Sequence, residues 1–134
     1  MKLRTFALSA LGCGVLAGMP AQAHHSFAAQ YDASKPVTLT GKVTKVEWTN
    51  PHIYIYIDVP DEKTGDVKNW ALEMGGPNAL IRLGWSRNSL KADDVVTVEG
   101  TLARDGSNLA NARSVVMAST GKKMFAGSSG GDGE

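Results

Sequence analysis

The sequence predicts an all-β domain with one short helix, and three observations lead to this prediction. Segments in which apolar and polar residues alternate, the pattern of half-buried strands, recur between short turns. The first of these segments contains a glycine and then changes the face that carries its apolar residues, which is typical of a strongly bent strand. A short helical pattern stands between the third and fourth segments. Together these features favour a five-stranded OB-like Greek-key barrel over a generic small β-sandwich.

The first predicted strand covers residues 37–48 and changes phase along its length. Its apolar side chains share one face as far as Val43, and the opposite face from Val46 onward. Gly41 lies close to this change. A strand that changes face near an internal glycine is expected to carry a bulge or a sharp bend, which suits a small and highly curved barrel.

The second predicted strand, residues 52–59, alternates most strictly of all the segments. Every second residue is aliphatic, so one face is expected to cover the core. A polar hairpin loop, residues 60–68, then leads to a third strand over residues 69–74. The polar face of the second strand carries His52, Tyr54, Tyr56 and Asp58.

The helix is predicted over residues 77–85, where Pro77 suits the first turn and Gly84 suits the end. A turn at residues 92–94 precedes the fourth strand, and residues 110–118 form the fifth. The helical residues expected to cover the core are Leu80, Ile81 and Leu83.

The chain divides into four predicted parts: a cleaved secretory signal peptide (1–23), an N-terminal arm (24–36), the OB-like β-barrel domain (37–118) and a disordered Gly/Ser-rich tail (119–134). The signal peptide is predicted from a basic start, an apolar run of about 15 residues and an Ala-Gln-Ala exit. The apolar run is shorter than the ~20 residues that span a bilayer, which disfavours a retained anchor. Lipidation at Cys13 is disfavoured because the preceding leucine is one position off. The expected location is the periplasm or the exterior, after Gram-negative type export.

Cleavage after residue 23 would change the composition in two ways. It would remove Cys13, the single cysteine, so that no disulfide could form. It would also remove Lys2 and Arg4 from the 14 basic residues, so that 12 would face 13 acidic residues. No basic patch is visible, which argues against nucleic acid as a partner. We expect a small ligand or another exported protein as partner and no membrane attachment after cleavage, and the oligomeric state stays open.

Three stretches of the chain together resemble a known family. They are "AHHSFAAQYD" (23–32), "KPVTLTGKVTKVEWTNPH" (35–52) and "LKADDVVTVEGTLA" (90–103). They are similar to a family of short exported bacterial proteins known only as domain of unknown function 6152. The resemblance implies an exported β-rich domain, and it brings no activity, cofactor or site residue.

The pair His24-His25 suggests a specific chemistry, because cleavage would make His24 the first residue. A terminal amine has an ordinary pKa of about 7.7–8.0, so a metal can displace its proton. The amine and the ring Nδ1 of His24 could then chelate one copper ion, and His52 could supply a third nitrogen. This arrangement is a histidine brace. His25 is a weaker candidate ligand than these two.

A second hypothesis needs no metal. Tyr54 and Tyr56, with Asp58 and Glu47 nearby, could form a ligand face on the second strand, where OB-fold proteins bind their ligands. Ordinary strand composition would explain the same tyrosines. The sequence has no Ser-His-Asp order, cysteine nucleophile or glycine-rich phosphate loop, so it favours a binding protein over an enzyme. A copper-dependent oxidase would follow only from a histidine brace.

Overall fold

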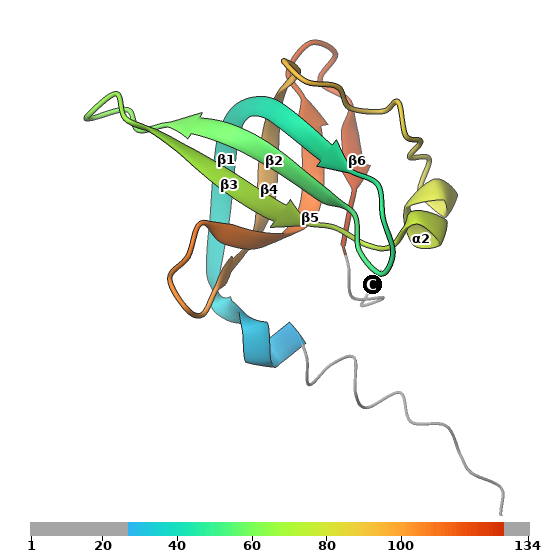
Figure 1. The fold of residues 1–134 in the computed structure, drawn as a ribbon, viewed down its shortest axis with the longest axis horizontal. Helices are drawn as coiled ribbons and strands as arrows, with labels where there is room; N and C mark the ends of the chain where they lie inside the picture. The colour runs from blue at the N-terminus through green and yellow to red at the C-terminus, as the bar shows by residue number, and fades with distance from the viewer. Residues whose placement is uncertain (1–26, 128–134) are drawn as a thin grey trace, which may run out of the picture.

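The computed structural model describes residues 27–127, and these residues form mostly β-structure (Figure 1). A helical turn covers residues 27–30. The predicted all-β class with a short helix between the third and fourth strands is confirmed. The elements are β1 Tyr31–Glu47, β2 Tyr54–Pro60, β3 Val67–Glu73, α2 Pro77–Arg82, β4 Val95–Ala103, β5 Leu109–Met117 and β6 Lys123–Phe125.

The strands form one sheet that closes on itself. The order of neighbours is β3-β2-β1-β4-β5-β6, and all of these pairs are antiparallel. A further parallel pairing of β3 with β5, from Ala71↔Leu109 to Glu73↔Asn111, closes a ring of five strands. β6 pairs with β5 outside this ring. α2 lies at one side of the ring, next to β6 (Figure 1).

The long strand β1 bends as its sequence predicts. It pairs with β4 through its first part and with β2 through its second part, and the register with β2 shifts between Val43 and Lys45. This shift is the change of face seen in the sequence, because an extra residue on one strand moves later side chains to the opposite face. A Cβ on Gly41 would collide with the backbone oxygen of Asp58, so glycine permits the close approach of the two strands.

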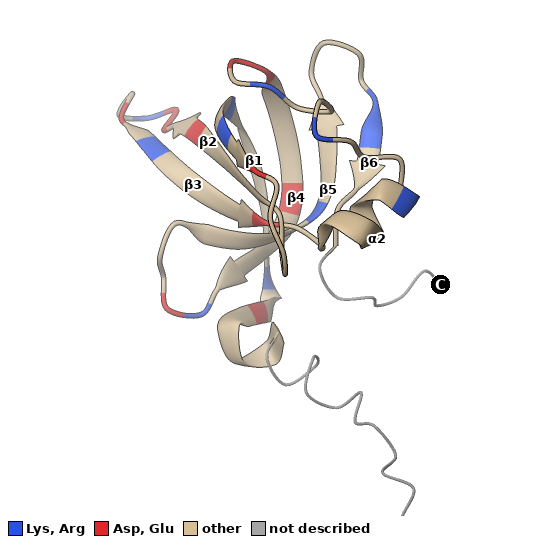
Figure 2. Cartoon of the chain, turned by 45° about the vertical axis from the view of Figure 1, so that its right-hand side comes forward, with Lys and Arg blue, Asp and Glu red and all other residues tan. Residues whose placement is uncertain are grey.

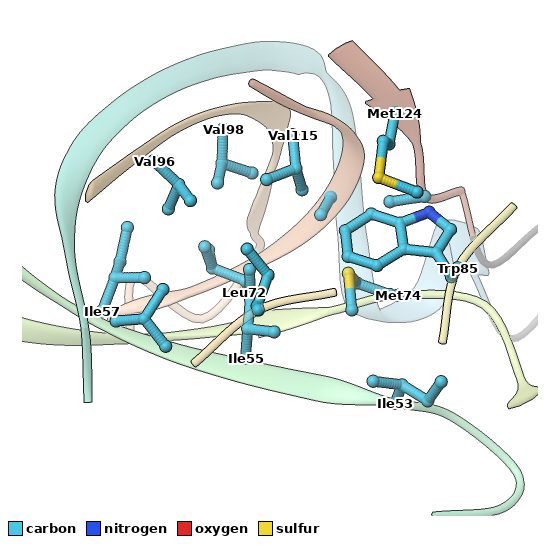
Figure 3. Packing of buried hydrophobic residues seen from close by; sticks show 14 of the residues in the cluster. Ile53, Ile55, Ile57, Leu72, Met74, Trp85, Val96, Val98, Val115 and Met124 are labelled. Atoms are coloured by element: carbon cyan, nitrogen blue, oxygen red, sulfur yellow. The ribbon is translucent and has the colours of Figure 1, made fainter. Parts of the chain in front are cut away.

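The core fills the inside of the ring (Figure 3). The aliphatic face of β2 is wholly buried at Ile55 and Ile57, as alternation predicts. Trp85, which follows α2, closes one end of the core, and its indole Nε1 donates a hydrogen bond of 2.8 Å to the backbone oxygen of Phe125.

The helix differs from its prediction in what it buries. α2 ends at Arg82, and Gly84 has the positive φ of 93° expected after a helix end. Leu80 is fully buried, but Ile81 and Leu83 are 55% and 50% exposed, so the prediction that they cover the core is wrong. A helix of six residues presents one narrow face to the core, and Leu80 occupies that face.

The predicted tail and arm also differ from the structure. Residues 119–127 are not disordered, because β6 pairs with β5 there, and Met124 and Ala126 are buried. The side chain of Met124 packs beside Trp85 (Figure 3). β1 begins at Tyr31, so part of the predicted arm belongs to the sheet. The predicted signal peptide, His24 and His25 lie outside the described residues. Among residues 27–127, the structure contains no helix of the length and apolarity needed to cross a bilayer.

Candidate functional site

A buried carboxylate, Glu73 at the end of β3, is the centre of the candidate site. It is 5% exposed and is surrounded by side chains from three other strands. Its Oε2 accepts hydrogen bonds from the hydroxyls of Tyr31 (2.9 Å) and Tyr54 (2.7 Å). Its Oε1 accepts one from Nδ2 of Asn111 (3.3 Å). A buried charge needs such partners, and an ionised carboxylate, which only accepts, matches this set of donors.

The two tyrosines are held as donors by the same environment. Burial raises the pKa of Tyr31 far above its ordinary value, and the hydrogen bond and negative charge of Glu73 raise it further. The pKa of Tyr54 is raised by the same causes in the same order. Losing either proton would place a phenolate against a buried carboxylate. Both hydroxyls therefore stay protonated across the physiological pH range and keep donating to Glu73.

His52 lies at the edge of this cluster. Its Nδ1 is 3.6 Å from Oε1 of Glu73, and its side chain is 36% exposed. The adjoining backbone is fixed, because Ile53 exchanges hydrogen bonds with Met74 and Gly75. A Cβ on Gly76 would lie 2.7 Å from the backbone oxygen at residue 51, so the β1–β2 loop packs directly on this glycine. His52 thus has one ring nitrogen against a buried carboxylate and a rigid backbone behind it.

The chain before β1 is attached next to the same cluster. The rings of Phe27 and Tyr31 lie 5.3 Å apart, centroid to centroid. Arg104, beyond β4, donates through Nε to the backbone oxygen of Ala28 (2.6 Å). Its backbone N–H donates to the backbone oxygen of Gln30 (2.9 Å). These contacts hold residues 27–30 beside Tyr31, the tyrosine at the start of β1 that donates to Glu73.

A second polar cluster covers the outer face of β1 and β2. Tyr56 donates to Oε2 of Glu47 (2.9 Å), and Lys45 pairs with the other oxygen of that carboxylate. These two contacts lower the pKa of Glu47, the bond to Lys45 more than the bond to Tyr56. The rings of Tyr54 and Tyr56 are stacked, with centroids 6.5 Å apart and planes at 28°. The paired rings connect this cluster to Glu73.

Asp58 lies further along the same face and has a separate partner. Its Oδ1 accepts a hydrogen bond of 2.8 Å from Nδ2 of Asn69, which also donates to the hydroxyl of Thr44 (3.3 Å). The structure therefore places the four predicted residues of the ligand face on adjoining strands. It gives the carboxylates of Glu47 and Asp58 partners within the protein.

Sequence reasoning missed the centre of the site. Glu73, Tyr31 and Asn111 were not among the predicted site residues, although His52 and Tyr54 were. Glu73 stands between Leu72 and Met74, so alternation places it on the outward face of a strand, as for any solvated glutamate. Within residues 27–127, no group of three or more His, Cys, Asp and Glu side chains could hold a metal ion.

Charged side chains are distributed over the molecule with both signs interleaved. Figure 2 shows Lys and Arg near Asp and Glu on most strands and loops of the described part. One such group joins three strands: Glu99 accepts from Ser114 (2.9 Å) and Lys123 (3.2 Å) and lies 3.7 Å from Arg113. The candidate site is therefore distinguished by its burial and not by an excess of charge.

Comparison with known proteins gives one result. Residues 14–112 match the model of a family described as a family of unknown function (DUF6152). Searches of curated proteins and of solved structures found no match. The matched region includes Glu73, His52 and both tyrosines that donate to Glu73. Since the match covers most of its length, the chain belongs to this family of unknown function.

Proposed function

We propose that the protein is a small exported binding protein that binds copper through His52 and the terminal amine and ring of His24. The observation that carries this proposal is the contact of 3.6 Å between Nδ1 of His52 and the buried carboxylate of Glu73. Histidines that bind metals commonly direct their other ring nitrogen to a carboxylate. Nε2 of His52, on the far side of the ring, would be the metal ligand.

The attachment of the preceding chain supports the participation of His24. Residues 27–30 are held beside Tyr31, whose hydroxyl contacts the same carboxylate as His52. Only two residues, His25 and Ser26, separate His24 from Phe27, and these three residue steps span at most about 10 Å. The described residues offer no three-ligand group of their own, so this proposal depends on the arm. It also depends on export and on cleavage after residue 23, which would give His24 a free amine and place the protein in the periplasm.

The experiment uses protein exported through its own leader. Mass spectrometry identifies the first residue, and Cu(II) is then titrated with EPR detection. We expect sub-micromolar binding with a spectrum of nitrogen ligands, lost in His52→Ala and retained in the matched control His25→Ala. Equal binding by a protein that keeps one additional methionine before His24 would refute the proposal, because that protein lacks the histidine amine.

We further propose that the closed ring is an OB-like Greek-key barrel. The ring order β1-β2-β3-β5-β4, with α2 between β3 and β4, supports this assignment. It leads to a second candidate function, metal-free binding of a small ligand or exported protein on the face of Tyr54 and Tyr56. The stacking of these rings favours it, because a paired aromatic surface can hold a flat apolar group. Binding that Tyr56→Ala abolishes and that a copper chelator leaves unchanged would select this function.

A further inference from the structure

The two ring nitrogens of His52 are in different environments. Nδ1 is 3.6 Å from Oε1 of Glu73, whereas the ring as a whole is partly exposed. A neutral imidazole carries a hydrogen on one ring nitrogen and a free lone pair on the other. The partner of one nitrogen decides whether the second nitrogen carries the hydrogen or the lone pair. The neighbour of Nδ1 therefore determines what Nε2 can do.

We propose that Glu73 is a positioning residue that fixes the tautomer of His52. At 3.6 Å the contact is longer than a hydrogen bond, but the negative charge of Oε1 favours the tautomer that carries its hydrogen on Nδ1, so that Nε2 keeps its lone pair. This orients His52 as a ligand for a metal ion, and to that extent the inference rests on the proposed copper site. The tautomer itself is a property of the metal-free protein.

The partners of Glu73 explain why it can hold this role. The hydroxyls of Tyr31 and Tyr54 both donate to Oε2, and Asn111 donates to Oε1. These three donors come from β1, β2 and β5, so hydrogen bonds from three strands hold the carboxylate beside His52. All of them need an acceptor, and Oε1, which accepts from Asn111, also faces the imidazole at 3.6 Å.

The same carboxylate also ties the arm to the site. Tyr31 is the first residue of β1, and its ring contacts Phe27. Oε2 of Glu73 thus accepts a hydrogen bond from the first residue of β1, and Oε1 faces His52. In the proposed copper site, this single side chain would set the distance between the arm and His52.

The test reads the tautomer directly. Nitrogen-15 NMR of the exported, metal-free protein distinguishes protonated from unprotonated ring nitrogens, and the pH is chosen so that the spectrum itself shows one of each. The His52 signals are identified by their loss in His52→Ala. We expect the proton on Nδ1 in the wild type and its transfer to Nε2 in Glu73→Leu. Glu73→Gln should preserve the wild-type tautomer, because its amide oxygen can still accept while its NH₂ group faces the tyrosine hydroxyls, which can also accept. The matched control Glu99→Gln alters a hydrogen-bonded glutamate away from His52 and should leave the tautomer unchanged.

Two results would overturn the inference: a wild-type His52 with its proton on Nε2, or a folded Glu73→Leu protein with the wild-type tautomer. If Glu73→Leu does not fold, the wild-type spectrum still decides, because a proton on Nδ1 supports the inference and a proton on Nε2 overturns it. Copper titration of the same proteins then tests the metal step, with an affinity loss of about 10–100-fold expected in Glu73→Leu and a smaller loss in Glu73→Gln. A wild type that binds no copper but has the Nδ1–H tautomer would refute the copper proposal and leave the role of Glu73 standing.

Discussion

Removing residues 119–134 should severely destabilise the domain, although their composition resembles a dispensable tail. Met124 is 7% exposed, and loss of a buried methionine side chain costs about 2–5 kcal/mol. Nε1 of Trp85 would lose its acceptor, the backbone oxygen of Phe125, and a buried donor left without a partner costs about 1–3 kcal/mol. The backbone of Ala126 also bonds to Arg113 and Gly75. A loss of at least about 3 kcal/mol is large for a domain whose total stability is of the order of 5–15 kcal/mol.

Urea unfolding followed by tryptophan fluorescence and far-UV circular dichroism measures this loss. A chain ending at Gly127 is the control, because it keeps every contact described for β6. Met124→Ala removes the side chain but keeps the strand, so it measures the contribution of the side chain alone, which should be a large part of the loss of stability. If the chain ending at Ala118 is as stable as the full chain to within about 0.5 kcal/mol, the reasoning is wrong, since that is the range of a neutral surface change.

Three further predictions concern single groups. In the folded protein, none of the three tyrosines should ionise near the ordinary pKa of about 10, because burial raises the pKa of Tyr31, Tyr54 and Tyr56. Their contribution to the free energy of unfolding is present below that pH, and it is lost as the pH rises through the raised pKa values. An ultraviolet titration that shows a tyrosine ionising normally before unfolding would contradict this. Gly100→Ala should lower the melting temperature markedly, because its Cβ would meet a backbone oxygen of β5; an unchanged melting curve counts against the register of β4 and β5. The pKa of Glu99 is lowered by its hydrogen bonds, most by the one from a serine and next by the one from a lysine. The contribution of Glu99 to the free energy of unfolding is therefore present above the ordinary carboxyl pKa and is lost on acidification. Glu99→Gln should therefore flatten the acid side of the stability profile, and an unaltered profile would show that these bonds do not stabilise the fold.

Alternation along the chain predicted the strands because burial on one face of a sheet repeats every two residues. The aliphatic face of β2 and the change of phase in β1 were both evident from residue types alone. Burial of Glu73 was not evident, because it depends on Tyr31, 42 residues earlier, and on Asn111, 38 residues later. No local pattern distinguishes a glutamate that is later covered by distant strands from one that stays in water.

The tail was misjudged in the opposite way, because residues that are buried in the fold were predicted to be disordered. The glycines and serines of residues 119–134 dominate its composition, and a three-residue strand is too short to produce a pattern. The side chain of Met124 packs beside Trp85 (Figure 3), which follows α2 in the chain. Both misjudged segments, residues 119–127 of the tail and residues 31–36 of the arm, join the fold through contacts with residues far away in the chain.

The parallel pairing of β3 with β5 has a consequence for how the chain reaches its native state. The β2–β3 hairpin joins residues close in sequence, but closing the ring requires β5, which ends at Met117. Contacts between distant residues must overcome the entropy of the long loops between them, which slows folding. A fragment that lacks β5 leaves the edge of β3 unpaired and the ring open. Synthesis from the N-terminus must therefore deliver nearly the whole domain before its interior can close against water.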